Sequence, residues 1–289
     1  MTESVHADRE ERLLSWVSAS FADTPDPRLR EVMLSLTRHL HGFLRDVRLT
    51  EAEWEAGIAF LTEAGRITTP VRQEFVLLSD VLGLSMLVVG INNRRPAKAT
   101  ESTVFGPFFV ENSPAFKNGD DIAKGFSGEP CFVTGRVVGV DGETVAGARV
   151  EIWQADDAGF YDVQNGEEPN GRGHLFTDEE GRFSFWSVKP EAYPIPADGP
   201  VGELLDAGGR GPMRPAHIHF MVTAEGYQRL ITHVFVEGDE YLDSDAVFGV
   251  RSALIAPFVR DGDHWTASYD LILAEGAAAP SDSPAKAPS

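Results

Sequence analysis

The chain has 289 residues, of which 42% are hydrophobic, and a formal net charge of −20. This acidic balance argues against nucleic acid and anionic membrane surfaces as partners, because both bind basic patches. The single cysteine, Cys131, excludes an internal disulfide and disfavours metal sites built from cysteine. The first residues lack the basic and apolar regions of a signal peptide, and no apolar stretch has the length of a membrane span. We therefore expect a cytoplasmic protein without membrane insertion.

The chain from residue 7 to about 95 is predicted to be helical. Asp26 followed by Pro27 is typical of a helix start, and apolar residues then recur at spacings of three and four over 29–47. Thr50 and Glu53 have the spacing of a capping box, which predicts a third helix after them.

A fourth helix is expected to open at Pro70 and to continue to Val89. It is apolar nearly all round, which predicts that it is buried between other elements. Residues 1–100 are thus expected to form a helical N-terminal domain.

From residue 129 the apolar pattern changes to a period of two, which is typical of strands. Residues 178–181 carry a hairpin signal between two of these strands. Short strands at this spacing predict an antiparallel β-sandwich over 101–275, so the expected fold class is α+β. The predicted strands include 132–138, 148–154, 182–186, 217–223, 230–236 and 268–273. Residues 276–289, rich in Ala, Pro and Ser, are expected to be a disordered tail.

His217 and His219 occupy alternate positions of a predicted strand, so their side chains share one face. Two imidazoles on one rigid strand are half of a metal site, although a bare His-x-His is a weak signal and also fits two histidines on a half-exposed face. Two long loops, 155–174 and 189–214, supply Tyr161 and Tyr193. Each tyrosine alone is also explained as a loop anchor.

Together, two neutral imidazoles and two phenolates offer a charge of −2 and two hard oxygen ligands. Fe(III) suits such a set, whereas zinc more commonly takes Cys, His or carboxylate. A phenol has a pKa of about 10 and ionises at neutral pH only beside such a cation.

In this order, Tyr161, Tyr193 and the segment Arg214-Pro215-Ala216-His217-Ile218-His219 resemble the intradiol ring-cleavage dioxygenases. The resemblance extends to Arg72–Gly83 and Glu101–Phe108 and is greatest to the catechol and hydroxyquinol 1,2-dioxygenase group. It implies that Tyr161, Tyr193, His217 and His219 bind non-haem Fe(III), and that O2 and a small aromatic diol or triol are the substrates.

The resemblance also marks three candidate catalytic residues. Tyr193 would leave the metal and accept a substrate proton. Arg214 would stabilise negative charge on the ring and product, although an arginine in so acidic a protein is more often a surface ion pair. His233 stands where catechol-cleaving enzymes tend to carry Gln, and it is given no defined role.

The substrate-binding residues implied by the resemblance surround the expected metal site. Asp80 is the most informative of them, because a carboxylate among apolar residues needs a partner. That partner is a third substrate hydroxyl, as in hydroxyquinol, or else Arg72 or a backbone amide. The full set is Leu77, Asp80, Val81, Val104, Phe105, Gly106, Pro107, Phe108, Ile195, Pro196, Arg214 and Val247.

Residues 231–250 look most like hydroxyquinol dioxygenases, whose product is 3-hydroxy-cis,cis-muconate, a tautomer of maleylacetate. Catechol or chlorocatechol is the alternative substrate. The resemblance further implies a homodimer joined by the N-terminal helices, often with a phospholipid between them. Two remote alternatives are a cupin-type metalloenzyme using Glu225 and a transthyretin-like binding protein without iron.

Overall fold

The computed structural model describes residues 2–69, 72–165 and 169–276. Contacts between Cα atoms divide the chain into two compact units, residues 1–62 and 63–289. The predicted helix start at Pro70 and nearly all of the predicted disordered tail lie outside the described residues.

The first unit contains α1 (Thr2–Ser20), α2 (Pro27–Val47) and most of α3 (Glu51–Ile67). The Asp26 carboxylate accepts hydrogen bonds from the backbone N–H groups of Arg28 (2.8 Å) and Leu29 (3.2 Å), which confirms the predicted start of α2. Thr50 and Glu53 form the reciprocal capping box before α3, with distances of 2.8 and 3.3 Å.

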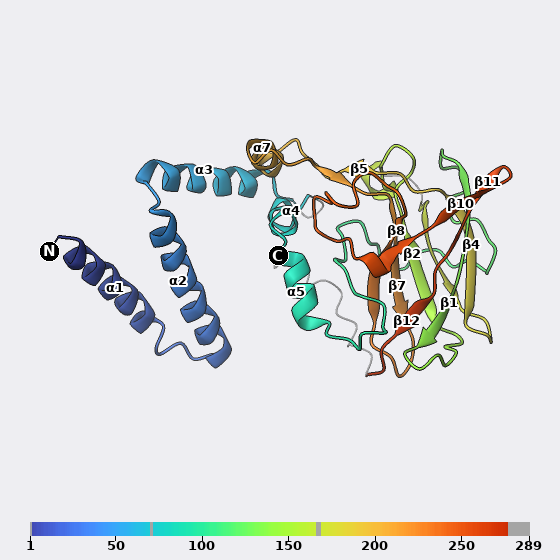
Figure 1. Ribbon diagram of the computed structural model, residues 1–289, viewed down its shortest axis with the longest axis horizontal. Helices are drawn as coiled ribbons and strands as arrows, with labels where there is room; N and C mark the ends of the chain where they lie inside the picture. Colours follow the sequence, from blue (N-terminus) through green and yellow to red (C-terminus); the bar gives the residue numbers. More distant parts are fainter. Residues whose placement is uncertain (1, 70–71, 166–168, 277–289) are drawn as a thin grey trace. The chain divides into compact units, whose positions relative to one another are not determined.

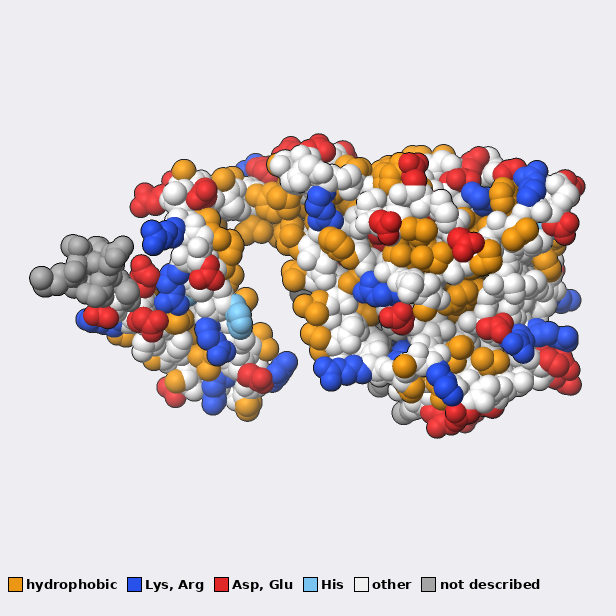
Figure 2. All heavy atoms as spheres, in the orientation of Figure 1, with side chains coloured by type: hydrophobic (Ala, Val, Ile, Leu, Met, Phe, Trp, Pro, Cys, Tyr) orange, Lys and Arg blue, Asp and Glu red, His pale blue; other side chains and the backbone are white. Residues whose placement is uncertain are grey.

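The apolar stripe of α2 is exposed in the single chain, and Figure 2 shows hydrophobic side chains along this helix. Its members are Leu29, Val32, Leu36, Leu40, Phe43, Leu44 and Val47, each at least 40% exposed. An apolar surface of this extent is unusual on a chain that acts alone.

The second unit begins with the end of α3 and continues into α4 (Glu74–Val81) and α5 (Leu84–Asn92). The prediction of one continuous buried helix is wrong, because the two helices meet at an angle of 78°. Gly83 lies between them with φ +72°, a conformation that glycine adopts without a Cβ penalty. Leu87 and Val88 are 60% and 57% exposed, so the burial prediction is wrong as well. Within the described residues, no single helix could span a membrane, and only this bent pair meets the length and composition criteria.

Two five-stranded sheets contain most of the strands of the second unit (Figure 1). The first contains β1 (Pro130–Gly139), β4 (Arg182–Val188), β10 (Phe258–Asp261), β11 (His264–Ser268) and β12 (Leu271–Leu273). The second has the order β3 (Arg172–Phe176), β2 (Arg149–Trp153), β7 (His217–Thr223), β8 (Leu230–Val236) and β9 (Ile255–Ala256). Between and after these strands lie α6 (Asp162–Asn165), β5 (Tyr193–Pro194), α7 (Pro200–Ala207), β6 (Met213–Arg214) and the 3-10 helix η1 (Ser252–Leu254).

The prediction of purely antiparallel sheets is wrong, because both sheets are mixed. β1 pairs in parallel with β11 and β12, and β8 pairs in parallel with β9. The hairpin predicted at 178–181 is also wrong. Asp178 and Arg182 do close a tight turn, with a backbone hydrogen bond of 3.0 Å, but β3 joins β2 whereas β4 joins β1. The turn therefore carries the chain from one sheet to the other.

One buried hydrophobic cluster takes side chains from both sheets. Val133 and Phe185 come from the first sheet, and Ile152, Ile218 and Phe220 come from the second. Because side chains alternate along β7, Ile218 and Phe220 enter this cluster while His217 and His219 face the other way.

Candidate metal centre and its surroundings

β7 places His217 and His219 on one face, as the sequence predicts, and each is only 2% exposed. The strand lies between β2 and β8, so its backbone is hydrogen-bonded on both sides. In register, His219 lies opposite Trp153 on β2 and opposite His233 on β8. The Trp153 ring stacks on the His219 ring with centroids 4.8 Å apart.

The two predicted tyrosines come from separate segments and are both buried. Tyr161 precedes α6 in the loop after β2, and it is 1% exposed. Tyr193 lies on β5 and is paired in register with Arg214 on β6. Gly159, at φ +85°, packs so closely that a Cβ would lie 2.4 Å from the Tyr193 Cβ, so this approach of the two loops requires glycine.

Four donor atoms form a closed ring inside the protein. Tyr161 Oη lies 3.0 Å from Tyr193 Oη and 2.9 Å from His219 Nε2. His217 Nε2 completes the ring, 3.4 Å from Tyr193 Oη and 3.2 Å from His219 Nε2. Two nitrogen and two oxygen donors, gathered from β5, β7 and a loop, thus converge on one point.

The second nitrogen of each ring-forming histidine has its own partner. His217 Nδ1 lies 2.7 Å from the Pro215 carbonyl, to which it can only donate. His219 Nδ1 lies 2.8 Å from His233 Nε2. Such contacts put the protons on Nδ1 and the lone pairs on Nε2, the arrangement in which proteins usually hold histidine ligands.

His233 joins these two histidines in a cluster in which one ring nitrogen from each residue lies within 4.8 Å of the other two. Three histidines at this distance could hold a metal ion. His233, however, contacts the Nδ1 side of His219, away from the ring of four donors. It therefore contacts His219 on the side of the ring opposite the four donor atoms.

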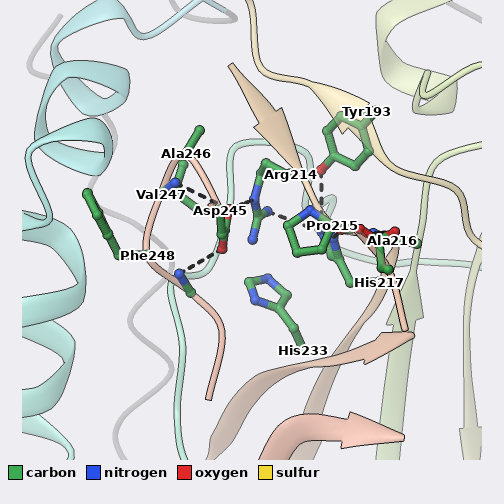
Figure 3. A network of polar contacts seen from close by, with 12 residues as sticks. Tyr193, Arg214, Pro215, Ala216, His217, His233, Asp245, Ala246, Val247 and Phe248 are labelled. Atoms are coloured by element: carbon green, nitrogen blue, oxygen red, sulfur yellow. Dashed lines mark hydrogen bonds and ion pairs between the residues drawn. The ribbon is translucent and has the colours of Figure 1, made fainter. Parts of the chain in front are cut away.

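Arg214 is buried beside the ring (Figure 3). Its Nη1 lies 3.1 Å from His217 Nε2, and its Nε lies 3.2 Å from a carboxylate oxygen of Asp245. Asp245 is held in turn by the backbone N–H groups of Val247 and Gly249. The guanidinium thus points toward the ring of donor atoms, and Arg214 is not part of a surface ion pair. This orientation is possible because Pro215 and Ala216 interrupt the strand between Arg214 and His217.

Burial controls the charge of the ring. Burial and the nearby guanidinium of Arg214 lower the pKa of His217 to about 3. Burial, followed by the neighbouring Tyr193, raises the pKa of Tyr161 well above its usual value. Without a cation the site therefore contains neutral imidazole and an un-ionised Tyr161 phenol, whereas a bound cation would favour the phenolate.

A buried ion pair holds the Tyr161 segment. Arg172 on β3 and Asp162, next to Tyr161, each have side chains 3% exposed, and Arg172 Nε lies 2.6 Å from an Asp162 oxygen. Arg172 also donates to the carbonyl of Phe108 (2.9 Å), whose ring stacks on Tyr161 with centroids 4.4 Å apart. The pair thus links the Tyr161 segment to Phe108, one of the predicted substrate-binding residues.

A cavity of about 540 Å³ lies beside Phe108. Its wall includes five predicted substrate residues: Leu77, Asp80, Pro107, Phe108 and Pro196. The other described residues of its wall are Arg72, Gln73, Glu74, Val76, Phe109, Val110, Val163 and Gln164. The remaining predicted substrate residues lie outside this wall. Of these, Val81, Val104, Ile195, Arg214 and Val247 are buried, and Phe105 and Gly106 are partly buried.

Asp80 is 9% exposed, and burial raises the pKa of its carboxyl while the hydroxyl of Ser85 and the charge of Arg214 oppose the shift. The alternative that Arg72 is the partner of the Asp80 carboxylate is wrong. Arg72 instead binds Asp198 (2.8 Å) and, more distantly, Glu74 (3.4 Å).

Sequence reasoning assigned no role to Asp162, Arg172, Asp245 or Trp153. The position of Asp162 directly after Tyr161 was an available signal, but its partner Arg172 lies beyond α6 and on another strand.

Comparisons with known proteins agree with this arrangement. Residues 104–275 match the family model described as dioxygenase, and residues 26–100 match the catechol dioxygenase N terminus. The chain belongs to the intradiol ring-cleavage dioxygenase family of enzymes. This assignment overturns the cupin and transthyretin-like alternatives.

Individual relatives indicate which members of this family the chain resembles. The chain is 54% identical to a hydroxyquinol 1,2-dioxygenase of Nocardioides simplex, over 92% of this chain and 96% of that protein. It is 57% identical to a 6-chlorohydroxyquinol 1,2-dioxygenase of Cupriavidus pinatubonensis, over 91% and 97%. The crystal structure of hydroxyquinol 1,2-dioxygenase from Pseudomonas putida DLL-E4 superimposes with a TM-score of 0.89 at 44% identity, covering 93% of this chain and all (100%) of that one.

Proposed function

We propose that this enzyme cleaves hydroxyquinol between its two adjacent hydroxyl-bearing carbons with O2, giving 3-hydroxy-cis,cis-muconate. The observation that carries the proposal is the closed ring formed by Tyr161, Tyr193, His217 and His219, with neighbouring donor atoms 2.9–3.4 Å apart. Two phenolate oxygens and two imidazole nitrogens fit non-haem Fe(III), and the family relationship supports the same metal. When bound, Fe(III) would supply a Lewis acid that holds both diol oxygens and withdraws electron density from the ring.

The protein's own groups would handle protons and charge. Tyr193 Oη lies 3.0 Å from Tyr161 Oη and 3.4 Å from His217 Nε2, and its phenolate would accept a proton from an arriving diol. Arg214, held by Asp245, presents a fixed positive charge at the same place and would stabilise negative charge on the substrate and the dicarboxylate product.

Asp80 would select the triol. Its carboxylate lies on the cavity wall with Leu77 and Phe108, where a third hydroxyl could donate a hydrogen bond to it. Catechol has no hydroxyl at that position and would leave the buried carboxylate without this partner.

The decisive experiment compares kcat/KM for hydroxyquinol, catechol and chlorocatechols on purified iron-containing enzyme. We expect hydroxyquinol to have the highest value and the protein to be red-brown, because tyrosinate bound to Fe(III) absorbs visible light. A preference for catechol or a chlorocatechol would transfer the assignment to that substrate. Colourless protein that stays inactive after iron loading would refute the metal site.

We also infer that the two sheets pack face to face as a sandwich, because one buried cluster takes side chains from both.

The exposed stripe of α2 supports a homodimer through the helical N-terminal region, with a phospholipid on the apolar surface. Sedimentation in detergent-free buffer tests the homodimer, and mass spectrometry of an organic extract tests the bound phospholipid. A cytoplasmic location remains a prediction.

A further inference from the structure

The contact between His219 and His233 defines the hydrogen positions of both rings. In the proposed site His219 binds the metal through Nε2, so its proton is on Nδ1 and is donated to His233 Nε2, 2.8 Å away. His233 accepts this bond and, as a neutral imidazole, carries its own proton on Nδ1. The contact joins two residues in register on β7 and β8, and His233 is completely buried.

The Nδ1 atom of His233 then lacks an acceptor. Among the described residues, His233 Nδ1 and Arg214 Nη2 are both buried atoms without a hydrogen-bond partner. A Cβ placed on Gly249 would lie 3.7 Å from His233 Nδ1 and 3.2 Å from Arg214 Nη2. It would also lie 3.1 Å from Asp245 Oδ2. The three atoms therefore border the same spot in front of Gly249, and Figure 3 shows the guanidinium of Arg214 above the His233 ring.

Two N–H donors cannot satisfy each other, and each buried unpaired donor costs about 1–3 kcal/mol. A water oxygen would accept from both His233 and Arg214 and would donate one hydrogen to the Asp245 carboxylate. Three polar partners are the usual number for a buried water.

We propose that His233 is a positioning residue for the metal ligand His219, and that one buried water links His233 to the Arg214–Asp245 pair. Through this series of hydrogen bonds, Arg214, which stabilises substrate charge, and His219, which binds the metal, hold each other in place. The proposal rests on the proposed iron site and adds to it the role of a residue outside the ring of donors.

The first test compares three variants of the iron-containing enzyme. His233→Leu removes the hydrogen bond, whereas His233→Gln retains a carbonyl that can accept from His219 and an amide that can donate to the water. Phe235→Leu is the matched control, because Phe235 lies on the same strand and its ring contacts both His217 and His233. The measurements are iron affinity and the position of the tyrosinate-to-iron absorption band.

We expect His233→Leu to lower iron affinity by about 10- to 100-fold and to shift the band, as loss of a partner of a metal-binding histidine usually does. His233→Gln should restore most of both, and Phe235→Leu should leave the band in place. Wild-type affinity and band position in His233→Leu would overturn the proposal, and so would a Gln variant that behaves like Leu. Absence of the band from the wild type would contradict the proposed function itself, and the inference would fall with it.

A high-resolution crystal structure of the iron-containing enzyme gives a second test that needs no variant. A water within hydrogen-bond distance of His233 Nδ1 and Arg214 Nη2 is expected. Direct contact of Arg214 with His233, or an empty space between them, would overturn the link even if His233→Leu failed to fold.

Discussion

Arg172 and Asp162 form an ion pair whose side chains are each 3% exposed, and the aspartate directly follows Tyr161 in the chain. The pair connects β3 to the segment that carries a proposed iron ligand, and through the Phe108 carbonyl it also reaches the cavity wall. A strong interaction is needed here because the Tyr161 segment has little regular structure of its own.

Asp162→Asn is therefore expected to destabilise the protein by about 3–5 kcal/mol, because it leaves the Arg172 charge buried and unpaired. Chemical denaturation measures the free energy of unfolding. Glu63→Gln is the control, since its pair with Arg66 has side chains 52% and 69% exposed, and should cost about 0.3–0.5 kcal/mol. If both variants lost the same free energy of unfolding, the buried pair would contribute no more to stability than the exposed pair.

Gly106→Ala should disturb the metal site. Gly106 has φ +77°, and a Cβ there would lie 3.0 Å from His219 Cε1. The backbone alone should cost about 1–3 kcal/mol, and the contact should also reduce iron bound per chain. Gly119→Ala separates the two effects, because Gly119 has φ +87° but a Cβ added there would meet no neighbouring atom within 4 Å. If Gly119→Ala lost as much iron, the effect of Gly106→Ala would come from the backbone and not from His219.

Tyr161→Phe is expected to abolish or shift the visible absorption band, because a phenolate oxygen is removed from the ring of donors. Absorption spectroscopy of iron-loaded protein is the measurement. Tyr227→Phe is the control, since the Tyr227 hydroxyl donates to Glu143 and takes no part in the ring of donor atoms. An unchanged spectrum in Tyr161→Phe would remove Tyr161 from the ligand set.

Asp80→Asn should lower the ratio of kcat/KM for hydroxyquinol to kcat/KM for catechol. Asn keeps a carbonyl that can accept from the third hydroxyl, so the substitution turns a hydrogen bond to a charged group into a neutral one, which corresponds to about 1–1.5 kcal/mol, or about 5- to 10-fold. Steady-state kinetics with both substrates gives the ratio. The proposed role of Asp80 does not survive if the ratio stays at its wild-type value.

The same residue predicts a pH dependence of stability. Burial raises the pKa of Asp80 in the folded state, so the folded protein binds the proton more tightly than the unfolded chain. The unfavourable contribution therefore appears as pH rises from the ordinary range of an aspartate through the raised pKa. Unfolding measured across this range should show Asp80→Asn gaining stability relative to the wild type as pH rises. A constant difference between the two proteins would contradict this assignment.

The sequence alone determined the features that depend on local pattern. A period of two placed His217 and His219 on one face of β7, and capping residues placed the starts of α2 and α3. The order of Tyr161, Tyr193 and the histidine pair along the chain also indicates the family.

Only the tertiary structure decided which distant segments meet. The turn at 178–181 looks the same in sequence whether its strands pair with each other or enter different sheets, and the two strands have different neighbours. The partners of Arg172, Arg214 and His233 likewise come from other segments. Spacing along the chain encodes which face a side chain occupies, whereas the group opposite that face depends on how the whole chain packs.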